Sequence, residues 1–326
     1  MLFPRCQALF FTRSQFYHNF NIFLSYEKHS FTDTDTMNIP FKKFLIAVLA
    51  ATTLFGGCSR QATQSQSPQN SQKQPQIIPS EQESSTPEQS SAPDKNAVDE
   101  GVWDLSDTDI SAVDTSRKLI AFTFDDAPAH TLENIFAVFA AYNEANPDCK
   151  ASATIFFNGI LFNSQTPHLL ATARALNFEL GNHTFSHYDL TTIDEPTLRE
   201  EIDKTDELLC FADGKPRHLL RAPFGKTNEL VKSVSPAPLI DWTIDTLDWT
   251  GVSADTIYRT VFENRFSGAI VLMHDGYRNT VDALKRLLPD LKADGYQIVG
   301  VSQLAKAHGC TLRRGKTYIR ARRQNA

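Results

Sequence analysis

The chain has 326 residues, 41% of them hydrophobic, and a formal net charge of −6 at pH 7. This length allows one large domain or two small ones. The acidic balance provides no general basic surface, which argues against nucleic acid as a partner, and it does not favour an acidic substrate either.

The first 58 residues predict export and a lipid anchor. Residues 1–36 are irregular and rich in Phe, and we interpret them as a non-native upstream extension, with translation beginning at Met37; a genuine extension is the alternative. Residues 37–58 contain two lysines, an apolar run too short to span a bilayer, and then Gly56-Gly57-Cys58, an order typical of an export signal. This ending resembles a bacterial lipoprotein signal, in which Cys58 is lipidated and becomes the mature N-terminus. An ordinary cleaved signal or an unlipidated anchor is the alternative.

This interpretation predicts an exported protein that is held by its lipid at a membrane and faces the periplasm or the cell exterior. Residues 59–96 are rich in Ser, Gln and Pro, with very few apolar residues. Such a segment cannot bury enough surface to offset chain entropy, so we expect a disordered tether. The acidic residues 97–116 are expected to pack loosely as an entry segment.

Residues 117–311 are predicted to form a single α/β domain, because apolar runs of strand length alternate with helical patterns. The expected strands are Leu119–Phe124, Ala153–Phe157, Phe178–Gly181, Leu219–Leu220, Leu239–Ile244, Ala269–Met273 and Gln297–Val301. The expected helices are Thr131–Asn146, His168–Leu176, Glu195–Phe211, Ala254–Phe262 and Val281–Ala293. Several strands are continuously apolar, which is typical of parallel strands covered on both faces.

Six or seven such units predict a closed or nearly closed barrel, shorter than the usual eightfold one. A doubly wound open sheet is the alternative, although no GxGxxG or GxxxxGK[ST] motif indicates a nucleotide site. Functional groups in such barrels lie at the carboxyl ends of the strands, and five of the apolar runs end in His, Arg or Asp.

The last residues, 312–326, are strongly basic. We interpret them as a solvated tail, with a basic arm that contacts anionic wall or envelope phosphate as the alternative.

Five cysteines are present, of which Cys6 precedes the predicted start and Cys58 is assigned to lipid. The remaining Cys149, Cys210 and Cys310 allow one disulfide and one free thiol, and the sequence does not select the pair. No CxxC spacing indicates a cysteine-based zinc site.

Two groups of residues suggest a metal. Asp125 and Asp126 directly follow the first predicted strand, and His183 and His187 are four residues apart, so that one turn of helix would direct both to the same side. Thr184 follows the first histidine, so the pair is not the HExxH of metalloproteases. A metal that acts on water needs a third protein ligand and one open position, and either Asp126 or Asp125 is the obvious donor.

Five motifs in this order resemble the polysaccharide deacetylases of the NodB-homology type, carbohydrate esterase family four, over Lys118 to about Ala307. The family patterns are TFDD, H[ST]xxH, RxPYG, D[ST]xDW and LxH. They are matched in turn by Thr123–Asp126, His183–His187, Arg221–Gly225, Asp245–Trp249 and Leu272–His274.

The resemblance implies a distorted (β/α)7-type barrel, complete or incomplete, and a divalent metal held by Asp126, His183 and His187. Zinc is the first expectation, and cobalt, nickel or manganese also suit a His₂Asp set. One position is left open for water and a substrate oxygen.

The resemblance also implies the proton-transfer residues. Asp125 would be the general base toward the metal-activated water, held ionised by Arg221. His274 would be the general acid, with Asp248 as its carboxylate partner.

Further residues are implied around the substrate. The backbone N–H of Phe224, where the family usually has Tyr, would stabilise the oxyanion. Trp249 and Leu272 would form an apolar slot for the acetyl methyl group, with ordinary core packing as the alternative, and Thr123 is grouped with these substrate and oxyanion residues.

One departure concerns Ala127, which stands where the family has Gly. If this position requires a positive φ, Ala strains the loop, whereas the cost is slight if the position only requires a small residue.

These features together predict removal of N-acetyl groups from a polysaccharide that contains N-acetylglucosamine, such as peptidoglycan, poly-N-acetylglucosamine or a chitin-like chain. An O-acetyl esterase of the xylan type is one alternative. A lipid-anchored glycan-binding protein with weakened catalysis is another.

Overall fold

A computed structural model describes residues 101–322 of the chain. The predictions for the upstream extension, the signal with Cys58 and the tether therefore lie outside the described residues. No helix within residues 101–322 is long and apolar enough to cross a bilayer.

A parallel sheet forms the centre of the domain, in the order β3-β2-β1-β6-β5. Its strands are β1 (Lys118–Ala127), β2 (Thr154–Phe157), β3 (Glu179–Asn182), β5 (Ile244–Asp245) and β6 (Ile270–His274), and β7 (Tyr296–Val299) pairs with the first residues of β1. The predicted α/β fold with a parallel sheet is confirmed.

The sheet curves into a distorted barrel through very short pairings. Beyond β3, Leu220 makes single bridges to Asn182 on one side and to Leu239 on the other. The run that begins with Leu239 in β4 (Leu239–Ile240) ends in β5, which pairs with β6. The run from Leu239 to β5 therefore connects the β3 edge of the sheet with β6 and closes the curve.

The first strand is central because it is apolar on both faces. Residues Leu119 to Phe124 are completely buried. Ile120, Phe122 and Phe124 contribute to the larger core cluster, whereas Leu119 and Ala121 contribute to a second one. Alternate residues of a strand point to opposite faces, so this strand joins two cores and holds its last residues rigidly.

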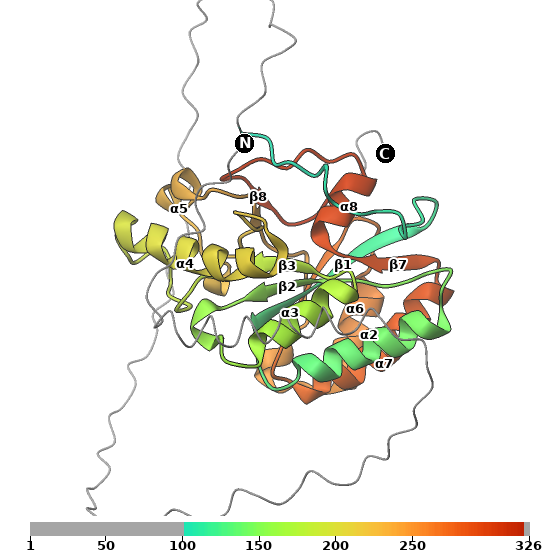
Figure 1. The fold of residues 1–326 in the computed structure, drawn as a ribbon. Coiled ribbons are helices and arrows are strands. Elements are labelled where there is room, and N and C mark those ends of the chain that lie inside the picture. The colour runs from blue at the N-terminus through green and yellow to red at the C-terminus, as the bar shows by residue number, and fades with distance from the viewer. Residues whose placement is uncertain (1–100, 323–326) are drawn as a thin grey trace, which may run out of the picture. The chain divides into compact units, whose positions relative to one another are not determined.

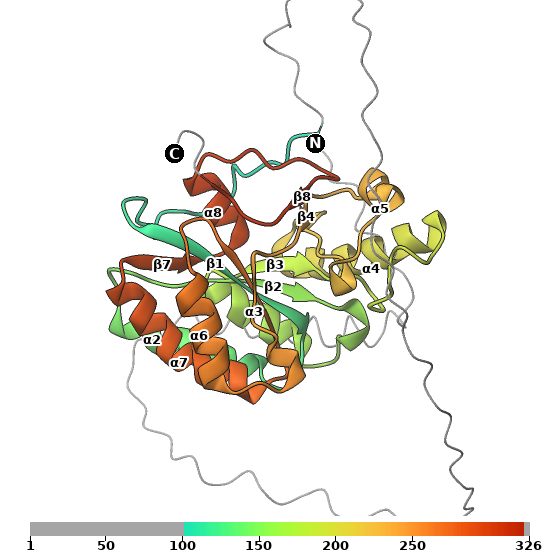
Figure 2. The ribbon, with the colours of Figure 1, turned by 180° about the vertical axis from the view of Figure 1, so that it is seen from behind.

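The predicted helices are present with shifted ends: α2 (Leu132–Ala145), α3 (Thr166–Ala175), α4 (Glu195–Asp213), α6 (Ala254–Asn264) and α7 (Arg278–Ala293). Figures 1 and 2 show α2, α3, α6 and α7 along one side of the sheet and α8 (Val301–Ala307) on the opposite side. Two short helices, α8 and α5 (Glu229–Val234), were not expected from the sequence.

Three strand predictions were partly wrong. Leu219–Leu220 makes only single bridges, and Pro223 soon afterwards cannot donate to a ladder. The run Leu239–Ile244 is divided in two because the carbonyls of Ile240 and Asp241 bind the Arg221 side chain. Val301 begins α8 and does not end β7.

The domain also extends beyond the predicted end at residue 311. Thr317–Tyr318 forms β8, which pairs with β4, and Ala321 donates its N–H to the Gly268 carbonyl. Leu312 and Ala321 are buried between exposed basic residues. The prediction of a solvated tail is therefore wrong for residues 312–322, which pair with the domain and bury Leu312 and Ala321.

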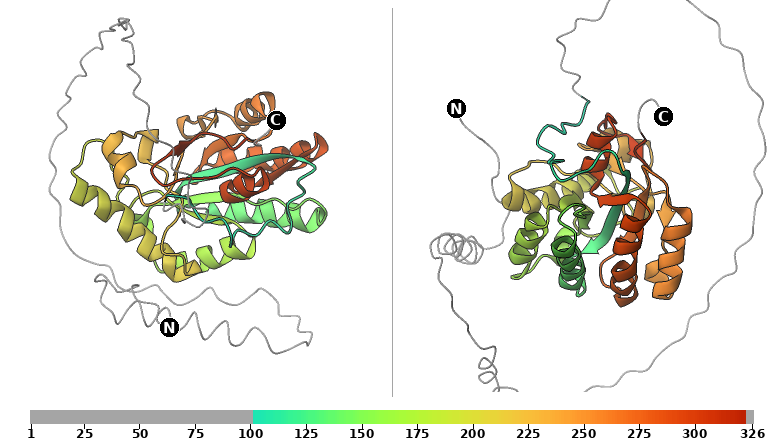
Figure 3. Two further views of the ribbon diagram at one scale, coloured as in Figure 1. Left: turned by 90° about the horizontal axis from the view of Figure 1, so that it is seen from above. Right: turned by 90° about the vertical axis from the view of Figure 1, so that its right-hand side faces the viewer.

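The entry segment packs beside this C-terminal stretch, as Figure 3 shows for the first and last coloured residues. Trp103 donates its N–H to Leu312 and packs with Leu105 and Val113 on the second core cluster.

The three cysteines of the described chain are free thiols. The disulfide that the sequence allowed is therefore absent from this part of the molecule.

Candidate metal and catalytic centre

The predicted site residues meet at the carboxyl ends of the strands. Asp125 and Asp126 lie at the end of β1, His183 follows β3, and His274 ends β6. Parallel strands bring these ends to one edge. His274 is directly opposite Asp125 in the register of β1 and β6.

Asp126, His183 and His187 could hold a metal ion, because their ligand atoms all lie within 4.8 Å of one another. Asp126 Oδ1 is 3.4 Å from His187 Nε2 and 3.7 Å from His183 Nε2. These separations are longer than hydrogen bonds and suit three donors around a common cation. No other group of this kind occurs among residues 101–322.

The environment of His183 favours the tautomer that a metal needs. Its Nδ1 lies 2.8 Å from the backbone carbonyl of Arg221, which can only accept a hydrogen bond. The proton therefore resides on Nδ1, and the lone pair of Nε2 faces Asp126. The backbone is fixed as well, because His183 N–H donates to Phe157 and the Asn158 amide donates to the His183 carbonyl at 2.6 Å.

Several residues of the centre have left-handed backbone conformations. The φ angle is 63° at Asp126, 68° at Thr184, 59° at His187 and 62° at Phe224. Such conformations cost about 1 kcal/mol or more for a residue with a side chain, so the surrounding contacts must maintain them. The centre is thus held in place by its neighbours and not by local preference.

Ala127 is not among these left-handed residues and is completely buried in the main core. The positive φ at this turn belongs to Asp126, one residue earlier. The concern that Ala strains the loop is therefore removed, since the position only needs a small side chain.

Asp125 lies almost completely buried beside Arg221, with Oδ1 2.8 Å from Nη1 of the guanidinium. Burial by itself raises the pKa of this carboxyl, but the charge of Arg221, aided by His183 and His274, outweighs burial and lowers it. Asp125 is therefore ionised and able to accept a proton.

Arg221 is completely buried, yet every nitrogen of its guanidinium makes at least one hydrogen bond. In addition to its ion pair, Nε donates to the Ile240 carbonyl at 2.9 Å and Nη2 to the Asp241 carbonyl at 3.2 Å, so four of the five N–H donors are used once the bond from Nη1 to Thr123 is included. The group lies 4.3 Å from the centre of the Phe156 ring and 5.6 Å from that of Trp242. These contacts compensate the desolvation of the charge and fix its orientation.

Thr123 does not fit its predicted place among the substrate residues. It is completely buried, its hydroxyl donates to the Val271 carbonyl at 2.6 Å, and it accepts a hydrogen bond from Arg221 Nη1 at 2.6 Å. No surface is left for a substrate. Thr123 instead positions Arg221 from the middle of β1.

His274 and Asp248, predicted as the acid and its carboxylate partner, form a hydrogen-bonded pair. Nδ1 of His274 is 2.7 Å from Asp248 Oδ1, and Asp248 also accepts from the His274 N–H and the Thr280 hydroxyl. Burial lowers the pKa of His274, but the hydrogen bond with Asp248, together with the charge of Asp125, raises it above its usual value. His274 therefore keeps its proton to a higher pH than an ordinary imidazole does.

The rim of the centre is apolar and open. The Phe224 ring is 61% exposed and lies against His187, with ring centres 4.7 Å apart. Trp249 is 53% exposed, which excludes ordinary core packing, whereas Leu272 is buried within β6.

Two supporting residues were given no role from the sequence. Asp275 accepts hydrogen bonds from the Ala129 N–H and the Thr131 hydroxyl, and its own N–H donates to the Asp125 carbonyl. Asn182 accepts from the Thr184 N–H at 2.8 Å. Asp275 directly follows His274 and Asn182 directly precedes His183, and only this adjacency in the sequence could have indicated their supporting roles.

The comparisons with known proteins agree with this geometry. The family described as polysaccharide deacetylase matches residues 112–237. Two peptidoglycan-N-acetylglucosamine deacetylases of Bacillus cereus are similar to the chain. One is 34% identical to this chain, and the match covers 55% of this chain and 66% of that protein. The other is 33% identical, and the match covers 60% of this chain and 91% of that protein.

The structure of peptidoglycan deacetylase PdaC from Bacillus subtilis is also similar, with 31% identity and a TM-score of 0.56 over 60% of this chain and 94% of that one. The curated Bacillus subtilis PdaC protein, called a peptidoglycan-N-acetylmuramic acid deacetylase, is longer, and the chain spans 40% of it. Family identity, parallel-sheet fold and clustered ligands coincide, and this chain belongs to the polysaccharide deacetylase family.

Proposed function

We propose that this protein is a metal-dependent hydrolase that removes N-acetyl groups from a polysaccharide containing N-acetylglucosamine. The main support is the arrangement of two proton-transfer groups at adjacent strand ends. Asp125, the base, is held ionised by Arg221, and His274, the acid, is held by Asp248. Both lie beside three side chains that could hold a metal. This arrangement suits hydrolysis of an amide, which needs both an activated water and a protonated leaving nitrogen.

Asp126, His183 and His187 would hold the metal. Their donor set, two neutral imidazoles and a carboxylate, fits zinc first and also cobalt, nickel or manganese. When bound, such an ion polarises the acetyl carbonyl and makes water more acidic.

Asp125 acts as the general base. Its Oδ1 is occupied by Arg221, and its Oδ2 faces the metal-ligating His183 at 3.6 Å from Nε2. The second oxygen is therefore the one that takes the proton of the attacking water. Arg221 and Thr123 prevent this carboxylate from turning away.

His274 acts as the general acid. Its Nδ1 is bound by Asp248, so Nε2 carries the proton that moves to the amide nitrogen as the C–N bond breaks. The backbone N–H of Phe224 stabilises the oxyanion, and Trp249 with Leu272 forms the slot for the acetyl methyl group.

The acid also favours the amide over the O-acetyl ester as substrate. An alcohol is a better leaving group than an amine, so an esterase depends less on a buried His–Asp pair. The intact ligand set likewise argues against a glycan-binding protein that has lost its activity.

The test is acetate release by the purified full chain from peptidoglycan, poly-N-acetylglucosamine, chitin oligomers and acetylated xylan, after chelation and after addition of single metals. We expect metal-dependent release from at least one N-acetylated glycan. Asp125→Asn should retain the metal and lose nearly all turnover. Release from acetylated xylan alone, or a protein that binds no metal, would contradict the proposal.

We also propose that Cys58 carries a lipid that anchors the protein on the outer side of a membrane, on the grounds of the signal-like residues 37–58. Cys58→Ser should move the protein from the membrane fraction to the soluble fraction in cells. Unchanged fractionation, or secretion of both forms, would contradict the lipid anchor.

A further inference from the structure

Helix α4 supports the stretch of chain that carries both metal-ligating histidines. Glu201 and Asp206 lie on the buried face of this helix, among apolar residues, and are only 6% and 2% exposed. A buried carboxylate is costly unless hydrogen bonds replace the water that it loses. The hydrogen bonds of these two carboxylates lead to residues 183–187, which we call the ligand segment.

Glu201 holds the ligand segment directly. Its Oε2 accepts the Ser186 N–H at 2.6 Å. Ser186 directly precedes the ligand His187, whose backbone is left-handed with a φ of 59°. A carboxylate is a strong acceptor for a backbone N–H, so this bond helps to maintain the unfavourable conformation beside it.

Asp206 acts on the same segment through Asn182. The Asn182 amide donates from Nδ2 to Asp206 Oδ1 and to the Ile202 carbonyl, both at 2.9 Å. Because α4 takes up both amide hydrogens, Oδ1 of Asn182 faces the ligand segment and accepts the Thr184 N–H at 2.8 Å. Thr184 is left-handed as well, with a φ of 68°, and it directly follows the ligand His183.

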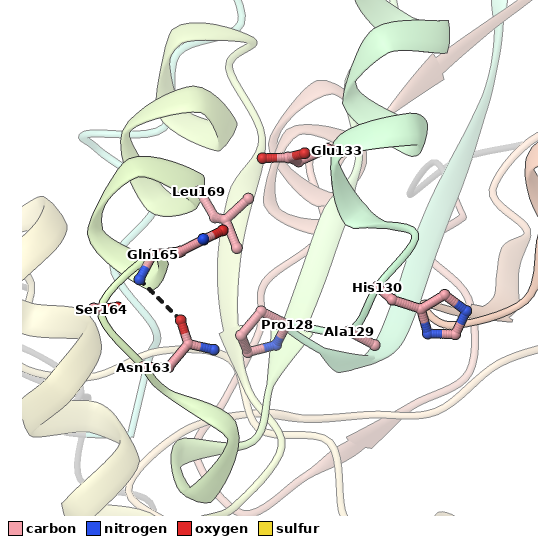
Figure 4. A pocket seen from close by; sticks show the side chains of 8 residues that line it. All are labelled: Pro128, Ala129, His130, Glu133, Asn163, Ser164, Gln165 and Leu169. Carbon is pink, nitrogen blue, oxygen red and sulfur yellow. Dashed lines mark hydrogen bonds between the residues drawn. The ribbon is translucent and has the colours of Figure 1, made fainter. Parts of the chain in front are cut away.

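The loop after β2 holds carbonyls of the ligand segment, so that N–H groups and carbonyls are both bound. Gly159 and Ile160 donate their N–H groups to the carbonyls at positions 184 and 185, at 3.1 and 2.9 Å. Further along, this loop borders a cavity of about 540 Å³, where Asn163 accepts the Gln165 N–H at 2.9 Å (Figure 4). The loop is therefore fixed by its own bonds, and α4 supplies the remaining support of the segment.

The charge of Asp206 is balanced by groups outside the ligand segment. His218 Nδ1 is 3.0 Å from Asp206 Oδ1, and Arg217 Nη1 is 3.3 Å from Oδ2. Asp213 lies 3.2 Å from the other ring nitrogen of His218 but, within the described part of the chain, makes no hydrogen bond with Asn182. Asp213 thus shares the buried ion pair with Asp206 but not the connection to the metal ligands.

Resting on the metal centre of the proposed function, we propose that Glu201 and Asp206 are positioning residues for the metal ligands. They hold the backbone between His183 and His187 in its left-handed form before the metal binds, which lowers the cost of ordering the ligands on binding. Neither carboxylate is itself a ligand. Helix α4 therefore adds to the metal affinity that the three ligands provide.

The test is the affinity of the metal-free full chain for Zn²⁺, measured by competition with a chelator. We expect Glu201→Ala and Asp206→Ala each to weaken binding by about 10- to 100-fold, as the loss of a group that orients a metal ligand does. Glu201→Gln keeps an oxygen for the Ser186 N–H and should recover most of the affinity. At saturating Zn²⁺ most of the turnover should return, because Asp125 and His274 are unchanged.

Asp213→Ala is the matched control, because it removes a carboxylate from the same His218 ring and leaves Asn182 bound. It should lower the urea midpoint of unfolding, as Asp206→Ala does, but bind Zn²⁺ like wild type. If Asp206→Ala does not fold, Glu201→Ala decides alone, since it leaves the ion pair of His218 intact.

Metal binding without turnover separates the two proposals. If no glycan releases acetate but Glu201→Ala weakens Zn²⁺ binding, the proposed function fails and the positioning role stands. If acetate is released and folded Glu201→Ala binds Zn²⁺ as tightly as wild type, only the positioning role is wrong. Equal weakening by Asp213→Ala would also overturn it, because lost stability would then explain the effect. A wild type that binds no metal would contradict both proposals.

Discussion

Two histidines of this domain are held by buried aspartates, but only one of them leaves a ring nitrogen available. His274 contacts Asp248 through Nδ1 alone, and its side chain is 13% exposed at the end of β6. His218 contacts Asp206 through Nδ1 at 3.0 Å and Asp213 through Nε2 at 3.2 Å, and its side chain is 1% exposed. The proposed role of His274 as an acid requires a free ring nitrogen, which His218 lacks although it also has a carboxylate partner.

The largest effect is expected for His274→Ala. Loss of a general acid typically lowers turnover by about 10²- to 10⁴-fold, and the amide substrate makes this dependence strong. The free energy of unfolding should fall by about 1 to 3 kcal/mol, because the buried Asp248 loses the ring of His274 but keeps the hydrogen bonds from the backbone N–H at position 274 and the Thr280 hydroxyl. Acetate release and urea unfolding measure the two quantities. Turnover near that of wild type would mean that another group protonates the leaving nitrogen.

A smaller, pH-dependent effect is expected for Asp248→Asn. Without the carboxylate, the pKa of His274 falls, so the protonated form is lost at a lower pH. Activity should drop more steeply at pH 8 than at pH 6, because each pH unit above the lowered pKa leaves about ten-fold less of the protonated imidazole. The pH profile of kcat/KM is the measurement. An equal loss of kcat/KM at all pH values would indicate that the structure around the hydrogen bond from the Thr280 hydroxyl is disturbed, and that the pKa of His274 is not what changed.

The converse result is expected for His218→Asn, which breaks a buried ion pair and should destabilise the fold by about 3 to 5 kcal/mol. Turnover per folded molecule should stay within about three-fold of wild type, because the side chain of His218 is buried and both its ring nitrogens are bound to carboxylates. Urea unfolding and active-site-normalised kinetics separate the two. A catalytic loss as large as that of His274→Ala would remove the distinction between the two histidines.

The pH dependence of stability should also identify His218. Burial lowers the pKa of this imidazole, but the hydrogen bonds that it donates to Asp206 and Asp213 raise it to about 9 in the folded state. A folded pKa above the unfolded value of about 6.5 stabilises the protein fully below pH 6.5, and this contribution is lost as the pH rises toward 9. The difference in unfolding free energy between wild type and His218→Asn should shrink across that window. A constant difference would show that His218 does not change its charge on unfolding.

The smallest effect is expected for Ala127→Gly, which restores the family residue. Ala127 has no left-handed backbone to relieve, so the change only removes a buried methyl group and adds flexibility to the unfolded chain. We expect a loss of about 1 to 2 kcal/mol in unfolding free energy and unchanged turnover. A gain in either quantity would show that Ala127 strains the loop.

The sequence predicted the parts of the fold that depend on local patterns. A continuous apolar run such as Leu119–Phe124 indicates a strand covered on both faces, and the predicted helix Glu195–Phe211 is present as α4. The strand at Leu220 and the pairing of β8 were not predictable, because they consist of one or two residues joined to distant parts of the chain.

The same division applies to the site. The motifs supplied Asp126, His183 and His187, which the fold brings together. They could not reveal that Asp126 is left-handed, nor that Asp275 holds the loop at Thr131, a contact between residues 144 positions apart. Thr123 was misplaced because a motif does not show whether the side chain of a residue inside the strand faces the substrate or the core.

Arg221 contributes two separate things to the centre. Its side chain restrains Asp125, while its main-chain carbonyl determines which nitrogen of His183 carries the proton. A substitution replaces only the first of these, and every variant inherits the carbonyl from the backbone. Mutagenesis at this position therefore tests only the restraint of Asp125. The effect of the carbonyl on the His183 tautomer can be tested only by a chemical change of the peptide bond itself.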